Sequence, residues 1–436
     1  RCKDGNSRRR NGGKARAEVA VAKERKRAEE GEATAATVAR MADGKKGGAP
    51  STAASNKLTG LTLKPVGAAS GSRSMEDCYD MVGQVGEGMY GQVYKMREKA
   101  GGKELCALKK VRMDNEKEGF PITAIREIKI LADVSRRKDN QNIVRLKEIV
   151  TSKANVGNDN KGDIYMVFEY MEHDLAGIRE NKQCHFNIDT IKVVVYQIIC
   201  GLLHCHRSSI LHRDLKCSNV LVNARGDVKL ADFGLARKTG DKRRLTPKVI
   251  TLWYRPLELL LGNQEYDTEV DMWSVGCILA ELLLEKPLLP GKDEPDQAYR
   301  ILQMFGIPTE ASWPGVSRLK MYKAYTEGKM FKENYLESHM MKYSKHTITP
   351  HCMDLLKKLL TLNPKERLDA YNAKMHPFFT KDTQNMGKEQ VYKKMKGQLA
   401  EALKHVIDSH EYEQRLKRKM EHRHGMPNNK QGKFFM

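Results

Sequence analysis

The pattern of apolar and polar positions separates an unpatterned start of the chain from a patterned remainder. Residues 1–74 contain no apolar repeat long enough to bury a core, so we expect a disordered basic tail there. Within residues 75–171, short apolar runs bounded by turn residues predict β-strands. These strands are expected at residues 81–85, 93–96, 105–109 and 164–167.

Longer apolar-periodic runs follow in residues 172–380 and predict a mostly helical region. The clearest of them are residues 188–211 and 267–284. A basic C-terminal extension, residues 381–436, contains one amphipathic pattern at residues 390–405 and is expected to be partly helical. The length of 436 residues therefore fits one large two-lobed domain with tails.

Three polar side chains surround a short hairpin in the middle of the chain. Apolar triplets at residues 220–222 and 228–230 flank a turn and predict the two strands. Asn219 precedes the first strand and Asp232 follows the second, so the hairpin brings them together. Mg²⁺ prefers oxygen ligands and shares them with substrate phosphates. We therefore expect a metal site at Asn219 and Asp232, with the nearby Asp214 left to act on a substrate.

Three glycines, Gly86, Gly88 and Gly91, lie between two predicted strands. Without a Cβ atom, their backbone can approach phosphate oxygens closely and direct amide groups at them. The same spacing before a helix is typical of dinucleotide-binding folds, but here a strand follows. The motif therefore favours a flap over a nucleotide.

The charge of the chain lies mostly in its tails. The formal net charge is +22 and the pI is about 9.5, and most of the excess is in residues 1–74 and 381–436. Basic runs such as 8–10, 23–27 and 415–419 fit nuclear-import signals or contacts with a polyanion such as RNA, and they equally fit solvated tails.

The cysteines suggest a reducing compartment. Nine are scattered without a CxxC pair, so we expect free thiols inside the cell. A zinc site at Cys200, His204, Cys205 and His206 is disfavoured, because the cluster lies in an apolar helical run without a second ligand pair.

No apolar stretch approaches the roughly 20 residues that span a bilayer, so no membrane partner is expected. Since the chain begins at Arg1, a targeting signal at a true N-terminus would not be visible.

Three motifs in order now point to a family. HRDLKCSN at residues 212–219, DFG at 232–234 and a P-x-E element at 256–258 resemble the signature set of eukaryotic protein kinases. The resemblance covers roughly residues 76 to 380. It implies an α+β, two-lobed kinase fold, with an N-lobe of mostly antiparallel sheet plus one helix (75–171) and a mostly helical C-lobe (172–380).

A further motif points to a branch of the family. PITAIRE at residues 121–127 resembles the cyclin-binding helix of cyclin-dependent kinases in their transcription-elongation branch, which includes the C-type kinases. Residues 147–152, 249–256 and 291–295 also look like that branch. The resemblance implies that a cyclin, of the K, T or L kind, docks on residues 119–130.

The resemblance implies ATP and Mg²⁺ as cofactors and assigns residues to them. Asp214, Lys216, Asn219, Lys109, Glu127 and Thr251 would carry catalysis. Lys109 would pair with Glu127, and Thr251 would tie the activation segment to Asp214 and Lys216. The nucleotide would contact Val85, Gly86, Glu87, Gly88, Gly91, Val93, Ala107, Lys109, Phe168, Glu169, Met171, Asp174, Leu221 and Asp232. Phe168 would be the gatekeeper as well as ordinary core, and Asp174 would face the ribose. Asp271 would brace the loop at residues 212–219, and Arg367 would be a buried partner of Glu258.

Regulation and substrate choice are implied in the same way. Thr246 would be the activating phosphosite, bound by Arg126, Arg213 and Arg237. Met89 stands where the family has threonine, which leaves Tyr90 as the inhibitory phosphosite.

Ile250 and Arg255 would select a proline after the target residue. In similar kinases the residue at Ile250 has a strained backbone and the arginine takes its carbonyl. A substrate amide would therefore find no acceptor there, and proline has no such amide. The implied substrate is the Ser-Pro-rich repeat tail of RNA polymerase II, and the implied location is the nucleus. One departure is Leu257, which replaces the second proline of P-P-E and is expected to soften that segment.

One alternative fits the motifs equally well, because another cyclin-dependent kinase with a different substrate would share them. Three further alternatives fit less well. A cyclin-binding pseudokinase scaffold would lack a metal or phosphate ligand, and none is missing. A mitogen-activated kinase carries T-x-Y where Pro247 and Lys248 follow Thr246, and a nucleic-acid-binding protein would need a folded basic module.

Overall fold

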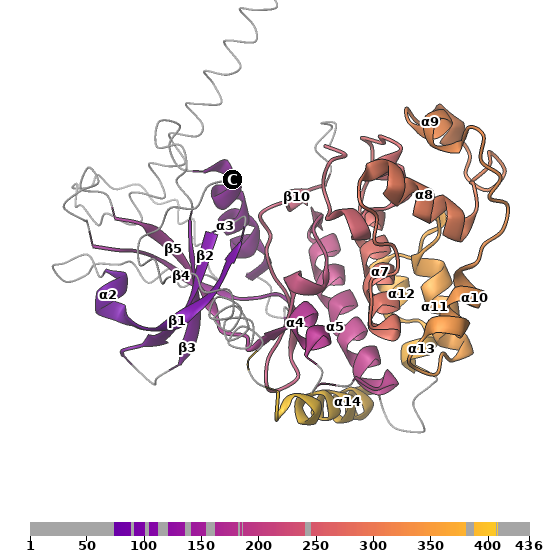
Figure 1. Cartoon of the computed structure of the whole chain (residues 1–436). Coiled ribbons are helices and arrows are strands. Elements are labelled where there is room, and N and C mark those ends of the chain that lie inside the picture. The colour runs from indigo at the N-terminus through magenta and orange to yellow at the C-terminus, as the bar shows by residue number, and fades with distance from the viewer. Residues whose placement is uncertain are drawn as a thin grey trace, which may run out of the picture.

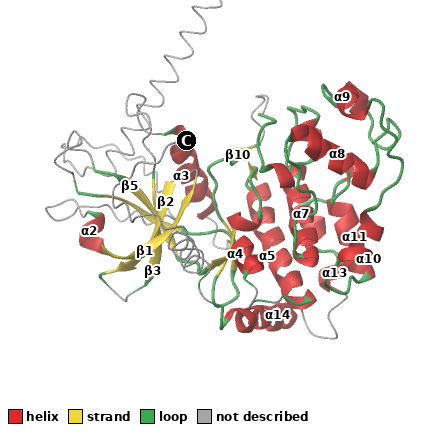
Figure 2. Cartoon of the chain, viewed as in Figure 1, coloured by secondary structure: helices red, strands yellow, loops and turns green. Residues whose placement is uncertain are grey.

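The computed structural model has a smaller, strand-rich lobe and a larger helical lobe (Figures 1 and 2). It describes residues 74–88, 91–100, 104–111, 121–135, 141–153, 162–181, 184, 186–239, 246–380, 388–406 and 408. Of the predicted tail at 1–74, only Ser74 is described, and it is buried and bridged to Thr151, so the tail ends before it. Residues 1–73, residues 119–120 of the expected cyclin-docking region, the expected phosphosite Tyr90 with its neighbour Met89, and both ends of the C-terminal extension lie outside the described residues.

The smaller lobe is an antiparallel sheet with one long helix, as the α+β prediction requires. A short helix, α2 (Met75–Cys78), leads into the sheet. The strand order is β1-β2-β3-β5-β4, and the strands are β1 (Tyr79–Gly88), β2 (Gly91–Glu98), β3 (Leu105–Lys110), β4 (Leu146–Thr151) and β5 (Ile164–Glu169). All four predicted strands are present. The prediction missed β4, and α3 (Ile122–Ser135) begins directly after Pro121, which suits a helix start.

The larger lobe begins with β6 (His173–Asp174), α4 (Leu175–Glu180) and α5 (Ile188–Arg207). The predicted helix at 188–211 was too long, because the chain turns at Ser209, where φ is +56°, and continues as β7 (Ile210–Leu211). The predicted hairpin is confirmed as β8 (Val220–Val222) and β9 (Val228–Leu230), preceded by η2 (Cys217–Asn219).

The rest of this lobe is helical apart from a short strand. Its elements are β10 (Arg237–Lys238), η3 (Leu252–Tyr254), α6 (Leu257–Leu260), α7 (Glu269–Leu284), α8 (Glu294–Phe305), η4 (Val316–Arg318), α9 (Tyr322–Thr326), α10 (Leu336–Tyr343), α11 (Pro350–Leu359), η5 (Pro364–Glu366), α12 (Ala370–Lys374), α13 (Pro377–Thr380) and α14 (Lys388–Leu403). The helix expected at 267–284 is α7, and the one expected at 390–405 is α14.

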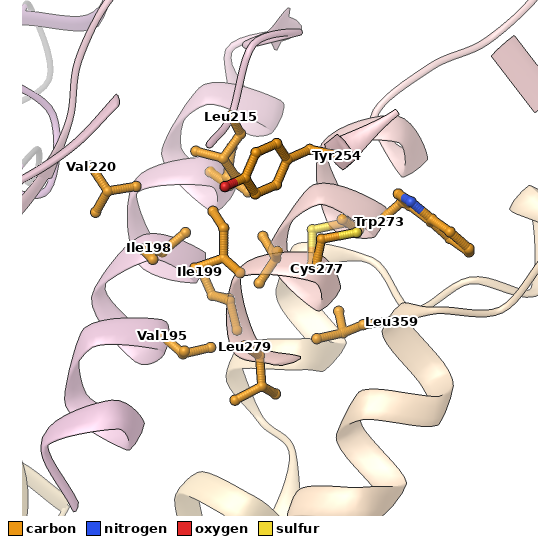
Figure 3. Packing of buried hydrophobic residues seen from close by; sticks show 14 of the residues in the cluster. Val195, Ile198, Ile199, Leu215, Val220, Tyr254, Trp273, Cys277, Leu279 and Leu359 are labelled. Atoms are coloured by element: carbon orange, nitrogen blue, oxygen red, sulfur yellow. The ribbon is translucent and has the colours of Figure 1, made fainter. Parts of the chain in front are cut away.

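The core of the larger lobe forms where α5 and α7 pack together. Figure 3 shows Ile198 and Ile199 of α5 in one cluster with Cys277 and Leu279 of α7. Trp273 of α7 is fully buried beside it. Such close packing fixes the loops that leave these helices, including the loop at residues 212–219.

Helix α5 corrects one expectation. By length and composition alone it could cross a membrane, so the expectation that no apolar stretch approaches that length was wrong. However, 78% of its most apolar window is buried inside the lobe. The apolar character of α5 is therefore explained by its place in the core (Figure 3).

The C-terminal extension folds back onto the domain. Helix α14 packs against α5, with Leu399 and Leu403 buried in the core (Figure 1). Lys396 of α14 forms an ion pair with Asp227 in the turn between β8 and β9. Beyond the helix, Asp408 pairs with Lys95 of β2 at 3.0 Å. The extension therefore contacts both lobes.

Candidate active site

Lys109, Glu127 and Asp232 meet between the lobes. The ammonium of Lys109, near the end of β3, lies 3.0 and 3.1 Å from the two carboxylate oxygens of Glu127 on α3. It also lies 3.2 Å from Oδ1 of Asp232. Antiparallel pairing of β3 with β5 fixes Lys109, and the buried side of α3 supplies Glu127. The structure thus brings together three residues that are far apart in sequence.

Burial and charge act against each other in this trio. Burial alone would lower the pKa of Lys109, but the carboxylates of Glu127 and Asp232 outweigh it, and the pKa is raised. The pKa of Glu127 is raised, because burial disfavours its charge more than the ammonium of Lys109 favours it. One ammonium therefore contacts two carboxylates, so a further positive charge beside Asp232 would be favourable.

The backbone around Asp232 directs its side chain toward Lys109. Its φ is +61°, an uncommon conformation that aspartate tolerates better than most residues. The next residue, Phe233, is fully buried, with its ring 4.8 Å from that of His212. His212 also contacts the carbonyl of Ala231 at 3.0 Å. Packing on both sides of Asp232 therefore holds the turn.

Asp271 of α7 holds the loop at residues 212–219. Its oxygens accept the backbone N–H groups of His212 and Arg213, each at 2.9 Å. Its Oδ2 also lies 2.9 Å from Nε2 of His206. Asp271 is completely buried, and the expected bracing contact is present. His206, one of the residues of the disfavoured zinc cluster, thus has a carboxylate partner in α7.

Within this loop, Asp214 contacts both Thr251 and Lys216. Its Oδ1 accepts the hydroxyl of Thr251 at 2.8 Å. Its Oδ2 lies 3.0 Å from the ammonium of Lys216, which also donates to the Thr251 hydroxyl at 3.2 Å. Asp214 is buried, whereas the side chain of Lys216 is partly exposed. The loop is thus joined through Thr251 to the activation segment, the stretch between DFG and the P-x-E element (residues 235–255).

Asn219 and Asp232, the residues expected to hold a metal, lie just before and just after the β8–β9 hairpin. The amide nitrogen of Asn219 donates to the carbonyl of Asp214 at 2.7 Å and to its Oδ2 at 3.1 Å. The amide oxygen is therefore turned away from Asp214. The backbone N–H of Ala231 donates to the carbonyl of Asn219 at 2.9 Å, which keeps Asp232 near this oxygen. One carboxylate and one amide oxygen are donors that Mg²⁺ accepts.

The residues expected around ATP lie on strands of the smaller lobe and on β6 and β8 of the larger one. Strand register places Val93 opposite Lys109, and Ala107 opposite Phe168. Gly88 and Gly91 are paired where β1 and β2 meet. The remaining expected contacts lie on β1 (Val85, Gly86 and Glu87), at the end of β5 and just beyond it (Glu169 and Met171), and on β8 (Leu221).

Asp174 has a role that the sequence did not reveal. Its Oδ1 accepts the backbone N–H of Gly177 at 2.9 Å and so caps the start of α4. Its contact with a ribose stays a prediction.

The activation segment carries Thr246 at an exposed position near the expected arginines. Tyr266 donates its hydroxyl hydrogen to the carbonyl of Thr246 at 2.8 Å, and Nη1 of Arg213 donates to the Tyr266 oxygen at 3.0 Å. The pKa of Arg126 is lowered by burial and by the positive charges of Arg237 and Arg213. The three arginines are therefore close enough to repel one another. Tyr266 was missed, because nothing in its local sequence marks it.

The segment expected to contact the substrate has the expected strained backbone. Ile250 has a φ of +67°, which is rare for a β-branched residue. Its carbonyl accepts hydrogen bonds from Nε and Nη2 of Arg255, at 3.2 and 3.0 Å. The carbonyl is therefore occupied.

Leu257 is accommodated at the end of this segment, and the expected softening stays a prediction. It is the first residue of α6 and is fully buried in the core. The next residue, Glu258, pairs with Arg367 at 2.7 and 3.1 Å, and both side chains are completely buried. The side chain of Leu257 fills space in the core, and the expected ion pair is intact beside it.

The fold and this site are those of a protein kinase. A family model described as protein kinase domain matches residues 79–379, which include both lobes.

Known relatives narrow the class. The chain is 49% identical over 323 residues to "Cyclin-dependent kinase C-1" of Oryza sativa, a match that covers 72% of this chain and 60% of the relative. It is 43% identical over 320 residues to "Cyclin-dependent kinase C-3" of the same plant, covering 72% of this chain and 94% of the relative. It is also 44% identical over 321 residues to "CTD kinase subunit alpha" of Schizosaccharomyces pombe, covering 73% and 51%. The chain belongs to the protein kinase family and, within it, to the C-type branch of the cyclin-dependent kinases. It spans about 60% of the length of the first of these relatives.

Proposed function

We propose that the protein is a cyclin-dependent serine/threonine kinase that transfers the γ-phosphate of ATP to Ser-Pro and Thr-Pro sites. The observation that supports this most is the contact of Asp214 with Thr251 and Lys216 in a loop braced by Asp271. This contact joins the reacting carboxylate to the activation segment. Such a link is needed if activation of the segment is to control catalysis.

Phosphoryl transfer passes through a loose transition state in which charge spreads over the phosphoryl oxygens. Positioning and neutralisation of charge therefore matter more than strong base catalysis. Asp214 orients the attacking hydroxyl and accepts its proton late in the reaction. Lys216, 3.0 Å from Asp214, supplies positive charge at the γ-phosphate.

The nucleotide binds between the lobes. Lys109, held by Glu127, contacts the α and β phosphates, and the glycine-rich β1–β2 hairpin covers them. Asn219 and Asp232 would hold Mg²⁺, which neutralises charge on the β and γ phosphates when bound. The adenine binds along the end of β5, beside Phe168, Glu169 and Met171.

Two events control activity in this proposal. A cyclin of the K, T or L kind docks on residues 119–130, where Ile122 exposes 69% of its surface. Docking keeps Glu127 against Lys109, the arrangement seen here. Phosphorylation of Thr246 then gives Arg126, Arg213 and Arg237 a common partner.

The substrate we propose is the Ser-Pro-rich repeat tail of RNA polymerase II, and the location is the nucleus. One relative carries the name "CTD kinase subunit alpha", and the occupied carbonyl of Ile250 suits a proline after the target residue. The basic tails would assist nuclear import or contact RNA.

The test is reconstitution with each cyclin. The full chain is co-purified with a K-, T- or L-type cyclin and assayed with radiolabelled ATP, Mg²⁺ and peptides of the repeat tail. We expect label on serines followed by proline from at least one complex, and at least about a thousandfold less from Asp214→Asn. Equal labelling by Asp214→Asn, or no labelling by any complex, would disprove the proposal.

A further inference from the structure

Arg255 makes two contacts with different groups at once. Its Nε and Nη2 donate to the carbonyl of Ile250 at 3.2 and 3.0 Å, while Nη1 donates to Oε1 of Glu294 at 2.7 Å. The arginine side chain exposes 13% of its surface and the glutamate 39%. A guanidinium has a rigid planar fork, so fixing one nitrogen limits where the other two point.

Glu294 is itself held in place by the start of α8. It is the first residue of the helix, where a negative charge is favoured by the helix dipole. Asp293 caps the helix by accepting the N–H of Asp296 at 2.8 Å. The preceding loop is tied to the substrate segment, because Nε1 of Trp253 donates to the carbonyl of Gly291 at 2.9 Å. The position of the Glu294 carboxylate is therefore fixed by the start of α8, and this carboxylate in turn positions Arg255.

The backbone at Ile250 needs such support. A β-branched residue is disfavoured at a φ of +67°, so the conformation persists only where its surroundings impose it. The hydrogen bonds from Arg255 are among those constraints. If the guanidinium were free to turn, the segment could relax and leave the carbonyl of Ile250 available to a substrate amide.

We propose that Glu294 is a positioning residue for substrate choice: by holding Arg255 on the carbonyl of Ile250, it makes the enzyme select proline after the target residue. This inference rests on the proposed kinase function. Glu294 touches neither the nucleotide nor the reacting hydroxyl and acts through Arg255. Its loss therefore changes which peptides are accepted, and transfer itself remains.

The experiment compares two peptides that differ only in having proline or alanine after the target serine. The cyclin complex is assayed for kcat/KM on each, for the natural chain, Glu294→Ala and Asp296→Asn. Asp296 is an acid in the same first helical turn that pairs with Arg300 and not with Arg255. It also accepts the backbone N–H of Lys292 at 2.9 Å, and an asparagine oxygen can still accept this bond, so Asp296→Asn removes the charge but keeps the loop. We expect Glu294→Ala to lower the proline-to-alanine ratio at least about fivefold, through a gain on the alanine peptide. Asp296→Asn should keep the ratio within about twofold.

A double-variant cycle shows whether Glu294 acts through Arg255. We expect Arg255→Ala and the Arg255→Ala, Glu294→Ala pair to have the same ratio, because the second change removes nothing further. A lower ratio for the pair would overturn the proposal, and so would an unchanged ratio in Glu294→Ala. If Glu294→Ala does not fold, Glu294→Gln replaces it, with an intermediate ratio expected and an unchanged one again overturning the proposal. Absence of transfer by the natural complex to either peptide would instead refute the proposed function.

Discussion

At the scale of single residues, Asp271 carries an unusual share of the site. It is completely buried and accepts hydrogen bonds from two backbone amides of the loop at residues 212–219 and from His206. Burial alone would raise the pKa of Asp271, but the contact with His206 and the backbone bonds outweigh it, and the pKa is lowered. Its carboxylate therefore stabilises the fold only while it is ionised.

We predict that Asp271→Asn lowers the free energy of unfolding by on the order of 3 kcal/mol near pH 7. Because the folded pKa of Asp271 lies below the unfolded one, its contribution is complete above about pH 5 and is lost as the pH falls through the folded value. Urea unfolding of both proteins at about pH 5, 4 and 3 should therefore give a difference that narrows as the pH falls. The exposed Glu265→Gln is the control, and a difference that stays constant over these pH values would contradict the prediction.

How far single residues could be predicted depended on whether a motif marked them. Lys109, Glu127 and Asp214 lie in short sequence motifs, and the structure brings them into the contacts that the resemblance implied. Tyr266 and the capping role of Asp174 could not be predicted, since each depends on a neighbour fixed only by tertiary packing. Leu257 shows the converse, because a departure from the family pattern at a buried position is accommodated by the core.

At the scale of elements, α14 shows what an amphipathic pattern can and cannot tell. The pattern predicted a helix at residues 390–405, close to Lys388–Leu403 as observed. It could not show which surface the apolar side covers, because that depends on the distant helix α5. The prediction missed β4 and made α5 too long for a similar reason. Short strands depend on their pairing partners, and helix ends depend on turns, more than either depends on the local pattern.

We predict that α14 is part of the folded domain and contributes to its stability. Leu399 is fully buried, so Leu399→Ala should lower the free energy of unfolding by about 2–5 kcal/mol through lost contacts and a cavity. The matched change Lys393→Ala, on the exposed side of the same helix, should stay within about 0.5 kcal/mol. Chemical unfolding of the two variants beside the natural chain measures this. Equal stability of both variants would mean that α14 does not pack on the lobe in solution.

At the scale of the whole molecule, three arginines from separate parts of the fold meet beside the activation segment. Arg126 comes from α3 of the smaller lobe, Arg213 from the loop at residues 212–219, and Arg237 from β10. Burial lowers the pKa of Arg126 most, and the positive charges of Arg237 and Arg213 lower it further. A phosphate on Thr246 would turn this repulsion into attraction and tie the two lobes together. The sequence supplied the three residues through its motifs, but the repulsion itself follows from their distances in the fold.

This arrangement gives a prediction in which one substitution has different effects in two states. Arg126→Gln should leave the unphosphorylated protein equally stable or more stable, by at most about 1 kcal/mol, because a partly exposed repulsion is screened by solvent. Phosphorylation of Thr246 should raise the Tm of the natural chain by about 2–4 °C. In Arg126→Gln that gain should fall by at least half, because one of three partners of the phosphate is gone. The measurement is thermal unfolding of the natural chain and of Arg126→Gln, each with and without phosphate on Thr246. The same gain in Tm on phosphorylation of both proteins would show that Arg126 does not reach the phosphate.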